Sequence, residues 1–333
     1  MEPSESLSIY LTQREADVSE STLQAHKYRL NHFVRWCENV AGIDDVSELS
    51  GEDLHSYRLW RREDGDLGKV AEKTQMDTLR VYIRTLERLD LVADDLHTAV
   101  ISPSLDDSDN QGEDILEASR AADILRDLAQ YKYASARHVV LLLCWRTALR
   151  TGSLRALDIE DYNSGERFIE VCHREETDTP LKNQDAGERH VALRKEVCDV
   201  LDDYIDRHRP GVTDDNGRKP LIATSHGRIS KTTLRNWSYQ LTQPCRISGS
   251  CPHGRDIDEC KAANSTDYPY ECPDSVALHA VRRGSITNML RSDVPLEGVG
   301  ARVDATRRTL EKHYDKRSAK EKMEQRRDYL EDF

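Results

Sequence analysis

Ten residues of this acidic chain, LHAVRRGSIT (278–287), concentrate positive charge through His279, Arg282 and Arg283. Apolar residues at helical spacing predict a helix here, which brings the three side chains to within about one turn of one another. Clustered guanidinium and imidazole groups can bind a phosphate, because arginine stays charged and can bond an anion in two places. The alternative interpretation is a solvated helix face.

Three further residues could take part in the same chemistry. Arg150 follows a deeply apolar segment, where a charge needs an anion or a carboxylate such as Asp158 or Asp161 to meet it. Lys182 lies in a long polar turn between two predicted strands, and Tyr314 lies in the polar segment LEKHYDKRS. Taken singly, the lysine is typical of a solvated loop and the tyrosine of an amphipathic helix.

A second group of reactive side chains consists of four cysteines with His253 among them. Their spacing is C-x5-C-x8-C-x11-C, and they are Cys245, Cys251, Cys260 and Cys272. The polar residues between them leave little to bury, and four thiolates around Zn²⁺ can stabilise such a segment. The segment contains no C-x-x-C pair, so unpaired thiols and disulfides remain alternatives. The other four cysteines stand at apolar-periodic positions and are predicted core residues: Cys37, Cys144, Cys172 and Cys198.

The elements that must position these residues fall into two groups. Residues 1–101 are predicted to form a small helical unit, with helices over 22–41 (Ser21 as N-cap), from about 50, and over 71–91. The polar stretch 102–114 is a predicted linker. Residues 115–333 mix helices with strands predicted at 167–173, 189–193 and 220–224.

Composition bounds the class of protein. Of 333 residues, 61 are acidic and 48 basic, which gives a formal charge of −13, and only 13 of the basic residues are lysine. Many carboxylates and few lysines keep a protein solvated in concentrated salt, so the chain resembles haloarchaeal proteins. Such a charge argues against nucleic-acid binding at low ionic strength. In molar salt the Debye length is about 3 Å, so only local positive clusters count.

Segments that would direct the chain to a membrane are not evident in the sequence. The N-terminus MEPSESLSIYLTQ has no basic start and no apolar core, and the longest apolar run is VVLLLCW. A membrane-spanning helix needs about 20 apolar residues. We therefore expect a cytoplasmic protein, in which cysteines serve as thiols or metal ligands.

The order of the cationic residues and the tyrosine along the chain resembles the tyrosine recombinase, or phage integrase, family. TALRTGSLRALDIEDY is similar to the family's first box, and LHAVRRGSIT is similar to its H-x-L-R-H box. Lys182 matches the lysine of the family's β-hairpin. Tyr314 follows Arg282 by 32 residues, a spacing similar to the family's. The residues that carry the resemblance are Arg150, Lys182, His279, Arg282 and Tyr314.

This resemblance implies a mainly α fold with a small β-sheet. A helical, SAM-like core-binding domain (1–101) would precede a mixed α+β catalytic domain (115–333), which carries a cysteine-rich insertion at 245–272. The implied activity is site-specific recombination of double-stranded DNA through a 3′-phosphotyrosyl intermediate, without a cofactor for catalysis. The implied assembly is a homotetramer on DNA, held by a C-terminal helix over 314–333.

The resemblance also implies a role for each site residue. Tyr314 would attack the phosphodiester, while Arg150 and Arg282 hold its non-bridging oxygens. Lys182 would protonate the departing 5′-oxygen, and His279 would take the tyrosine proton or support the phosphate.

The sequence departs from the family's pattern at two positions. Arg283 stands where many members have histidine. The third-box histidine or tryptophan, nine residues before the nucleophile, corresponds to Ala305, and Arg302 and His313 are out of register. The alternatives are a catalytically impaired recombinase-like DNA-binding protein and a zinc-centred interaction protein.

Overall fold

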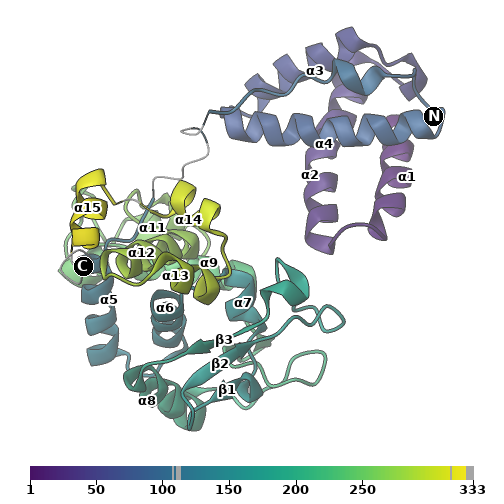
Figure 1. Cartoon of the computed structure of the whole chain (residues 1–333). Helices are drawn as coiled ribbons and strands as arrows, with labels where there is room; N and C mark the ends of the chain where they lie inside the picture. Colours follow the sequence, from purple (N-terminus) through teal and green to yellow (C-terminus); the bar gives the residue numbers. More distant parts are fainter. Residues whose placement is uncertain (107–108, 110–113, 316, 328–333) are drawn as a thin grey trace. The chain divides into compact units, whose positions relative to one another are not determined.

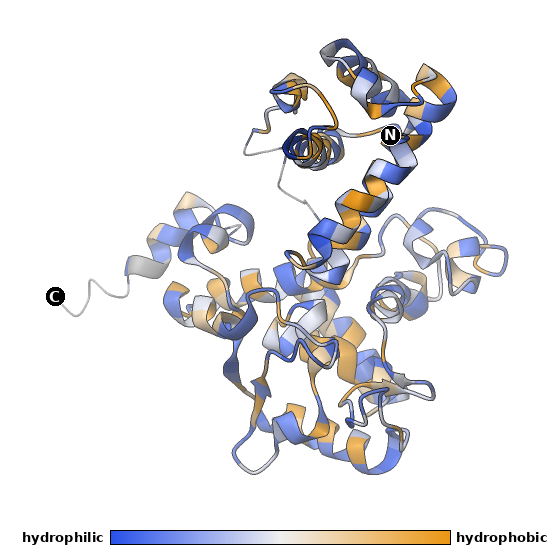
Figure 2. Cartoon of the chain, turned by 90° about the vertical axis from the view of Figure 1, so that its right-hand side faces the viewer, coloured by the Kyte–Doolittle hydropathy of each residue, from blue (hydrophilic) through white to orange (hydrophobic). Residues whose placement is uncertain are grey.

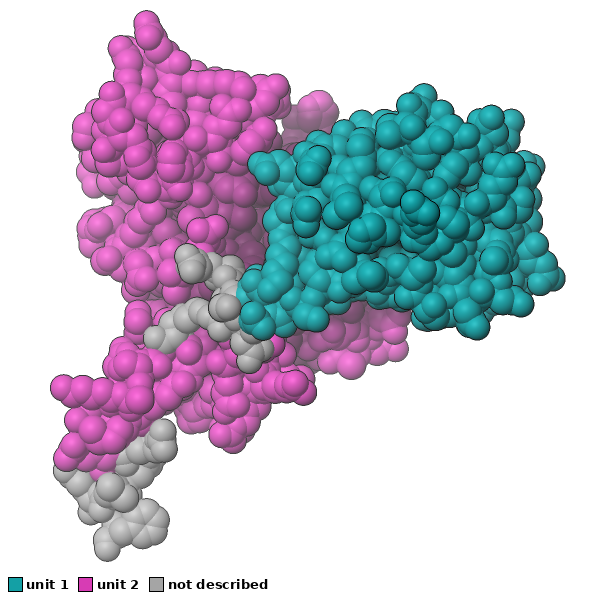
Figure 3. Space-filling view, turned by 90° about the horizontal axis from the view of Figure 1, so that it is seen from above, with its two compact units in different colours: residues 1–112 teal, residues 113–333 magenta. Residues whose placement is uncertain are grey.

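The computed structural model describes residues 1–106, 109, 114–315 and 317–327. The chain divides into two compact units, residues 1–112 and 113–333, which are coloured teal and magenta in Figure 3. The division falls inside the stretch 102–114 that the sequence predicts as a linker. None of the helices in the described ranges is long and apolar enough to cross a membrane.

The first unit is helical. Its α-helices are α1 (Pro3–Glu15), α2 (Glu20–Trp36), α3 (Gly51–Asp64) and α4 (Lys69–Arg88), joined by short helical turns at Cys37–Ala41, Val46–Glu48 and Leu96–Ala99. The N-cap of α2 is Ser19, which accepts a hydrogen bond from the Thr22 amide, so the prediction of Ser21 was wrong. Ser50 and Asp53 form a capping box at the start of α3. Hydrophobic and hydrophilic residues are interspersed along the helices of the chain (Figure 2).

The second unit surrounds a central helix with further helices and a small sheet (Figure 1). The α-helices are α5 (Ala118–Tyr131), α6 (Ala136–Thr147), α7 (Thr151–Ala156), α8 (Lys195–Asp203), α9 (Lys231–Leu241), α10 (Cys245–Ser248), α11 (Lys261–Asn264), α12 (Leu278–Arg291), α13 (Leu296–Val303), α14 (Arg307–His313) and α15 (Ala319–Arg327). Short helical turns lie at Ile159–Asp161, Gln184–Gly187, Tyr204–His208 and Pro269–Glu271.

The sheets of the second unit are antiparallel and short. Strands β1 (Tyr162–Asn163), β2 (Phe168–Val171) and β3 (Arg189–Ala192) pair in the order β1-β2-β3, with Ile169 opposite Val191. β4 (Ala223–Thr224) pairs with β5 (Gly227–Arg228), so the strand predicted at 220–224 is shorter than expected. The predicted fold class, mainly helical with a small sheet, is confirmed.

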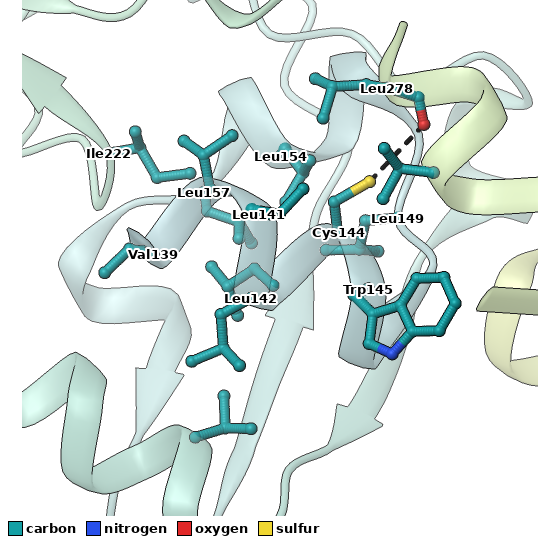
Figure 4. Packing of buried hydrophobic residues seen from close by; sticks show 14 of the residues in the cluster. Val139, Leu141, Leu142, Cys144, Trp145, Leu149, Leu154, Leu157, Ile222 and Leu278 are labelled. Carbon is teal, nitrogen blue, oxygen red and sulfur yellow. Dashed lines mark hydrogen bonds between the residues drawn. The ribbon is translucent and has the colours of Figure 1, made fainter. Parts of the chain in front are cut away.

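The core of the second unit is built around α6. Every residue from His138 to Trp145 is buried. Figure 4 shows Leu141, Leu142 and Cys144 of α6 among the buried hydrophobic residues around it. The Cys144 thiol donates to the Leu278 carbonyl at 3.6 Å, which ties α6 to the start of α12. α12 lies very close to the segment just before α5 at Gly284, where an added Cβ would lie 2.0 Å from the Leu116 carbonyl oxygen. Only glycine fits that contact.

A smaller apolar cluster fixes the C-terminal helices to α12. It contains Ala148, Ile286, Leu290, Val299, Val303, Leu310 and Tyr314. The helix predicted over 314–333 begins later than expected. α14 ends at His313, and the next helix, α15, begins only at Ala319. Residues 316 and 328–333 of that prediction lie outside the described residues.

Candidate functional site

Arg282 is a charged side chain in the interior of the second unit. It lies on α12 with only 1% of its surface exposed. Its guanidinium donates to the carbonyl oxygens of Ala148 and Val303, the latter at 2.8 Å. Within the described residues its Nε finds no hydrogen-bond partner. Burial lowers the pKa of Arg282, and the nearby Tyr314 opposes that shift. The group is therefore a buried cation with spare hydrogen-bonding capacity.

Tyr314 lies against this cation. Its ring centre is 5.8 Å from the Arg282 Cζ atom and 6.2 Å from the centre of the His279 ring. The residue ends α14, and its carbonyl oxygen accepts a hydrogen bond from the Thr287 hydroxyl at 2.8 Å. The main chain at Tyr314 is thus tied to α12, the helix that carries both neighbours.

Arg150 stands at the N-cap of α7, after the left-handed residue Ala148 that ends α6. Its guanidinium grips Asp304, with Nη1 2.5 Å from the carboxylate Oδ2 and Nη2 2.6 Å from the main-chain oxygen. A carboxylate does meet Arg150, as the alternative interpretation expects, but it is neither Asp158 nor Asp161. Asp158 pairs with Arg218 and Arg228, and Asp161 pairs with Arg174.

His279 lies in the first turn of α12 and keeps part of its ring exposed. Desolvation and, after it, the charges of Arg283, Arg282, Lys182 and Arg150 together lower its pKa to about 4. The imidazole is therefore neutral near pH 7 and can accept a proton. The four cations lie near enough to this imidazole to act on its pKa.

Lys182 is exposed in the loop between β2 and β3. The loop is fixed on either side of it. The main-chain amide of Leu181 donates to His173 Nδ1 at 3.0 Å. The side-chain amide of Asn183 donates to both carboxylate oxygens of Asp304, at 2.9 and 3.0 Å. The ammonium thus projects from an anchored segment.

Of the five sequence-predicted residues, the structure places Arg282 and His279 against the ring of Tyr314. Arg150 and Lys182 lie near enough to His279 to help lower its pKa. Ala305, the third-box position by register, packs against the apolar cluster near Tyr314. The side chain that meets Arg150 belongs to Asp304, one residue earlier. Arg302 is engaged elsewhere, since it donates to the carbonyl oxygens of Arg146 and Ala192. Counting nine residues back from Tyr314 leads to Ala305, so it missed Asp304, which lies ten residues before Tyr314.

Arg189 is a further cation that the sequence did not single out. It lies on β3, where Nε donates to the Arg302 carbonyl at 2.8 Å and Nη1 to the Gly187 carbonyl at 2.6 Å. Burial lowers its pKa to about 10; Asp304 opposes this, whereas Arg282, Arg150 and Arg302 add to it. Among the described residues, its buried Nη2 has no partner.

The four clustered cysteines line one small pocket of about 10 Å³, together with His253. That is roughly the room one water molecule needs. In the described ranges, no three His, Cys, Asp or Glu side chains are arranged to hold a metal ion. All eight cysteines are free thiols, so the disulfide alternative was wrong. His253 is engaged with Asp274 at 2.9 Å. Of the predicted core cysteines, Cys172 is half-buried and the other three are buried.

Comparisons with known proteins identify the fold. No protein-family model matches the chain, and no curated protein sequence matches it. An integrase of the Tn1549 transposon, solved with transposon right end DNA, matches at 13% identity over 99% of this chain and 100% of that one, with a TM-score of 0.69. A lambda integrase dimer bound to a COC′ core site matches at 13% identity over 95% and 96% of the two chains, with a TM-score of 0.63.

A shorter structure resembles part of the chain. It is the N-terminal domain of a phage integrase/site-specific recombinase from Haloarcula marismortui, with 33% identity over 31% of this chain and 97% of that one and a TM-score of 0.30. The full-length likenesses confirm the predicted resemblance at the level of the fold.

Proposed function

We propose that this chain, which has the fold of the tyrosine recombinases, cuts and rejoins DNA at specific sites through a tyrosine–phosphate intermediate. One observation carries the proposal: a buried phenol lies 5.8 Å from a buried guanidinium and 6.2 Å from an imidazole that further cations surround. A site of that kind suits a dianionic group more than any neutral substrate.

The proposed step is an in-line displacement at phosphorus. The Tyr314 oxygen forms a bond to phosphorus as the bond from phosphorus to the 5′-oxygen breaks, which leaves a 3′-phosphotyrosine and a free 5′-hydroxyl. The phenolic proton passes to His279, which is neutral near pH 7. Lys182 gives its proton to the departing oxygen. Religation is the reverse of this step.

The two arginines stabilise the charge that develops on the phosphate. Arg282 is fixed by two carbonyl oxygens, so it needs little reorganisation when the phosphate arrives. Arg150 lies at the N-terminus of α7 and adds a second guanidinium from another element. The fork of each group bonds non-bridging oxygens in two places.

Double-stranded DNA is the proposed partner. The structural relatives reported above include DNA complexes of integrases that match this chain over nearly its whole length. The formal charge of −13 opposes DNA binding at low ionic strength. The cations of the site meet one phosphate locally, and we propose that the chain works in concentrated salt, where distant acidic charges are screened.

A nicked suicide substrate tests the proposal. Cleavage next to the nick releases a short strand and traps the protein on DNA as a covalent adduct, which denaturing electrophoresis detects. We expect the adduct with the full chain and its complete loss in Tyr314→Phe. Tyr131→Phe is the matched control, because that tyrosine is 70% exposed on α5. DNA binding without any adduct, at low or molar salt, would instead establish the impaired DNA-binding protein.

We also propose that the protein acts as a homotetramer on two DNA sites, with the C-terminal segment bound to a neighbouring protomer. The segment contains the polar helix α15, whose Met323 is 45% exposed. Light scattering of the protein–DNA complex measures the stoichiometry. Removing residues 318–333 should reduce the assembly while leaving each chain folded, and a tetramer that survives this truncation contradicts the proposed contact.

A structural zinc ion at Cys245, Cys251, Cys260 and Cys272 is a further part of the proposal. The four thiols line the same pocket. Desolvation raises the pKa of Cys245, and Cys272 and Cys251 lie near enough to raise it further. Zinc binding would draw them into a tetrahedron. We expect elemental analysis of purified protein to find one zinc per chain, which the fourfold Cys→Ser variant lacks. Equal zinc content in the two proteins would refute the site and the interaction protein built on it.

A further inference from the structure

We propose that Asp304 is a positioning residue, which holds the Lys182 loop and Arg150 against the segment that carries Tyr314. This inference rests on the proposed function. Asp304 accepts hydrogen bonds from two different elements: Arg150 binds its carboxylate and its main-chain oxygen, and Asn183 binds both carboxylate oxygens.

The residues that Asp304 holds lie close in sequence to the proposed general acid and nucleophile. Asn183 directly follows Lys182, and Asp304 lies ten residues before Tyr314. Because the lysine side chain is flexible, the position of its ammonium group depends on how well the main chain of its loop is fixed. The bond from Asn183 therefore sets where the proposed general acid stands relative to the nucleophile.

The remainder of the loop also closes onto Asp304. A Cβ added at Gly187 would lie 3.4 Å from the Asp304 Oδ2 atom. Beyond it, Arg189 joins the Gly187 carbonyl to the Arg302 carbonyl at the end of α13. The second half of the loop between β2 and β3, from Asn183 to Arg189, is thus fastened to the end of α13 and to Asp304.

The backbone at Asp304 is shaped for this task. The residue is left-handed, with φ 53° and ψ 62°, a conformation that aspartate tolerates better than most residues do. It ends α13, and the following Ala305 amide bonds the Gly300 carbonyl at 3.1 Å. A Cβ at Gly300 would lie 2.9 Å from the Ala305 carbonyl oxygen, so glycine there leaves room for the turn.

A carboxylate at this point cannot do the work of a third-box histidine or tryptophan. An ionised carboxylate only accepts hydrogen bonds, and it repels a phosphate. Asp304 therefore acts through its partners, Arg150 and Asn183. It also lessens the mutual repulsion of the cations, as its effect on the pKa of Arg189 shows.

The test compares two suicide substrates. One has the natural 5′-oxygen at the scissile phosphate, and the other has sulfur in its place, whose thiolate leaves without needing a proton. Misplacing a general acid slows only the oxygen substrate. We expect Asn183→Ala to form adduct about tenfold more slowly on the oxygen substrate and at the wild-type rate on the sulfur substrate. Asp304→Ala should be slower still, with partial recovery on sulfur, because Arg150 is released too.

Three reference variants set the scale. Lys182→Ala should lose more activity than Asn183→Ala on oxygen and recover on sulfur. Arg150→Ala should be slow on both substrates. Asp185→Ala removes an exposed carboxylate of the same loop and should behave as wild type on both. Thermal melting of every variant separates a rate effect from a loss of folding.

Several results would overturn the inference. Equal loss on the two substrates in Asn183→Ala would show that the loop anchor does not serve the acid. Faster cleavage by Asp304→Asn than by the wild type would show that the carboxylate obstructs the phosphate. If the wild type forms no adduct on either substrate, the proposed function itself fails, and this inference fails with it.

Discussion

Arg282 and Tyr314 form a buried pair in which the guanidinium carbon lies 5.8 Å from the centre of the phenol ring. The arginine is held by carbonyl oxygens at the ends of α6 and α13, and the tyrosine by a hydroxyl on α12. The cation thus joins three helices and lies against the proposed nucleophile, so we expect it to have both a structural and a chemical role.

Replacing Arg282 should reveal both roles. Arg282→Ala leaves the Ala148 and Val303 carbonyl oxygens without donors, at a cost of about 1–3 kcal/mol for each buried group. We expect the free energy of unfolding of the second unit to fall by about 2–5 kcal/mol in urea titrations. Arg126→Ala is the control, since its exposed pair with Asp123 contributes well under about 1 kcal/mol. A stability equal to wild type would contradict the described hydrogen bonds.

The low pKa of His279 predicts a stability that depends on pH. The folded protein holds this pKa at about 4, below the ordinary 6.5, so the unfolded chain binds the proton more readily. The resulting loss of stability begins as pH falls below 6.5 and is complete below about 4. NMR titration of the free protein should give an imidazole midpoint well under 6.5. Between pH 7 and pH 5, the free energy of unfolding should fall less in His279→Gln than in the wild type. An equal fall in the two proteins would contradict the lowered pKa of His279.

Salt should affect this protein in the direction opposite to ordinary DNA-binding proteins. Adduct formation should rise from about 0.1 M to above about 1 M KCl, because screening removes the repulsion between the acidic surface and DNA while close contacts in the site persist. Adduct yield on the nicked substrate across a KCl series measures this. A log-linear decline from the lowest salt onward would contradict the proposal.

The contact at Gly284 predicts a selective sensitivity to one methyl group. Gly284→Ala places a Cβ against the Leu116 carbonyl and 2.9 Å from the Trp145 ring, so α12 must move away from the Leu116 segment and the Trp145 side chain. We expect a loss of at least about 1–3 kcal/mol in unfolding free energy. Gly152→Ala on α7 meets nothing within 4 Å and should leave stability unchanged or raise it by up to about 1 kcal/mol. Similar melting temperatures for the two variants would contradict the close approach.

Much of the fold could be predicted from the sequence, because α4 and α5 have clear apolar periodicity and α6 is a nearly continuous apolar segment. The site could be predicted only in part. Arg150 and Tyr314 stand out by residue type and order along the chain, but their neighbours depend on how helices end. Asp304 ends α13 in a left-handed conformation, and spacing alone does not reveal such a turn. A carboxylate partner for Arg150 was an alternative in the sequence, but the sequence did not show that Asp304 is that partner.

The hydrogen bond from Thr287 to the Tyr314 carbonyl bears on whether one protomer supplies all the residues of the proposed site. It fastens the nucleophile to the helix that supplies His279 and Arg282 from the same polypeptide, so each copy assembles its own reactive centre in cis. Mixing a protomer that lacks the phenol with one that lacks the buried guanidinium should therefore give no complementation, because no centre in the mixture would be whole.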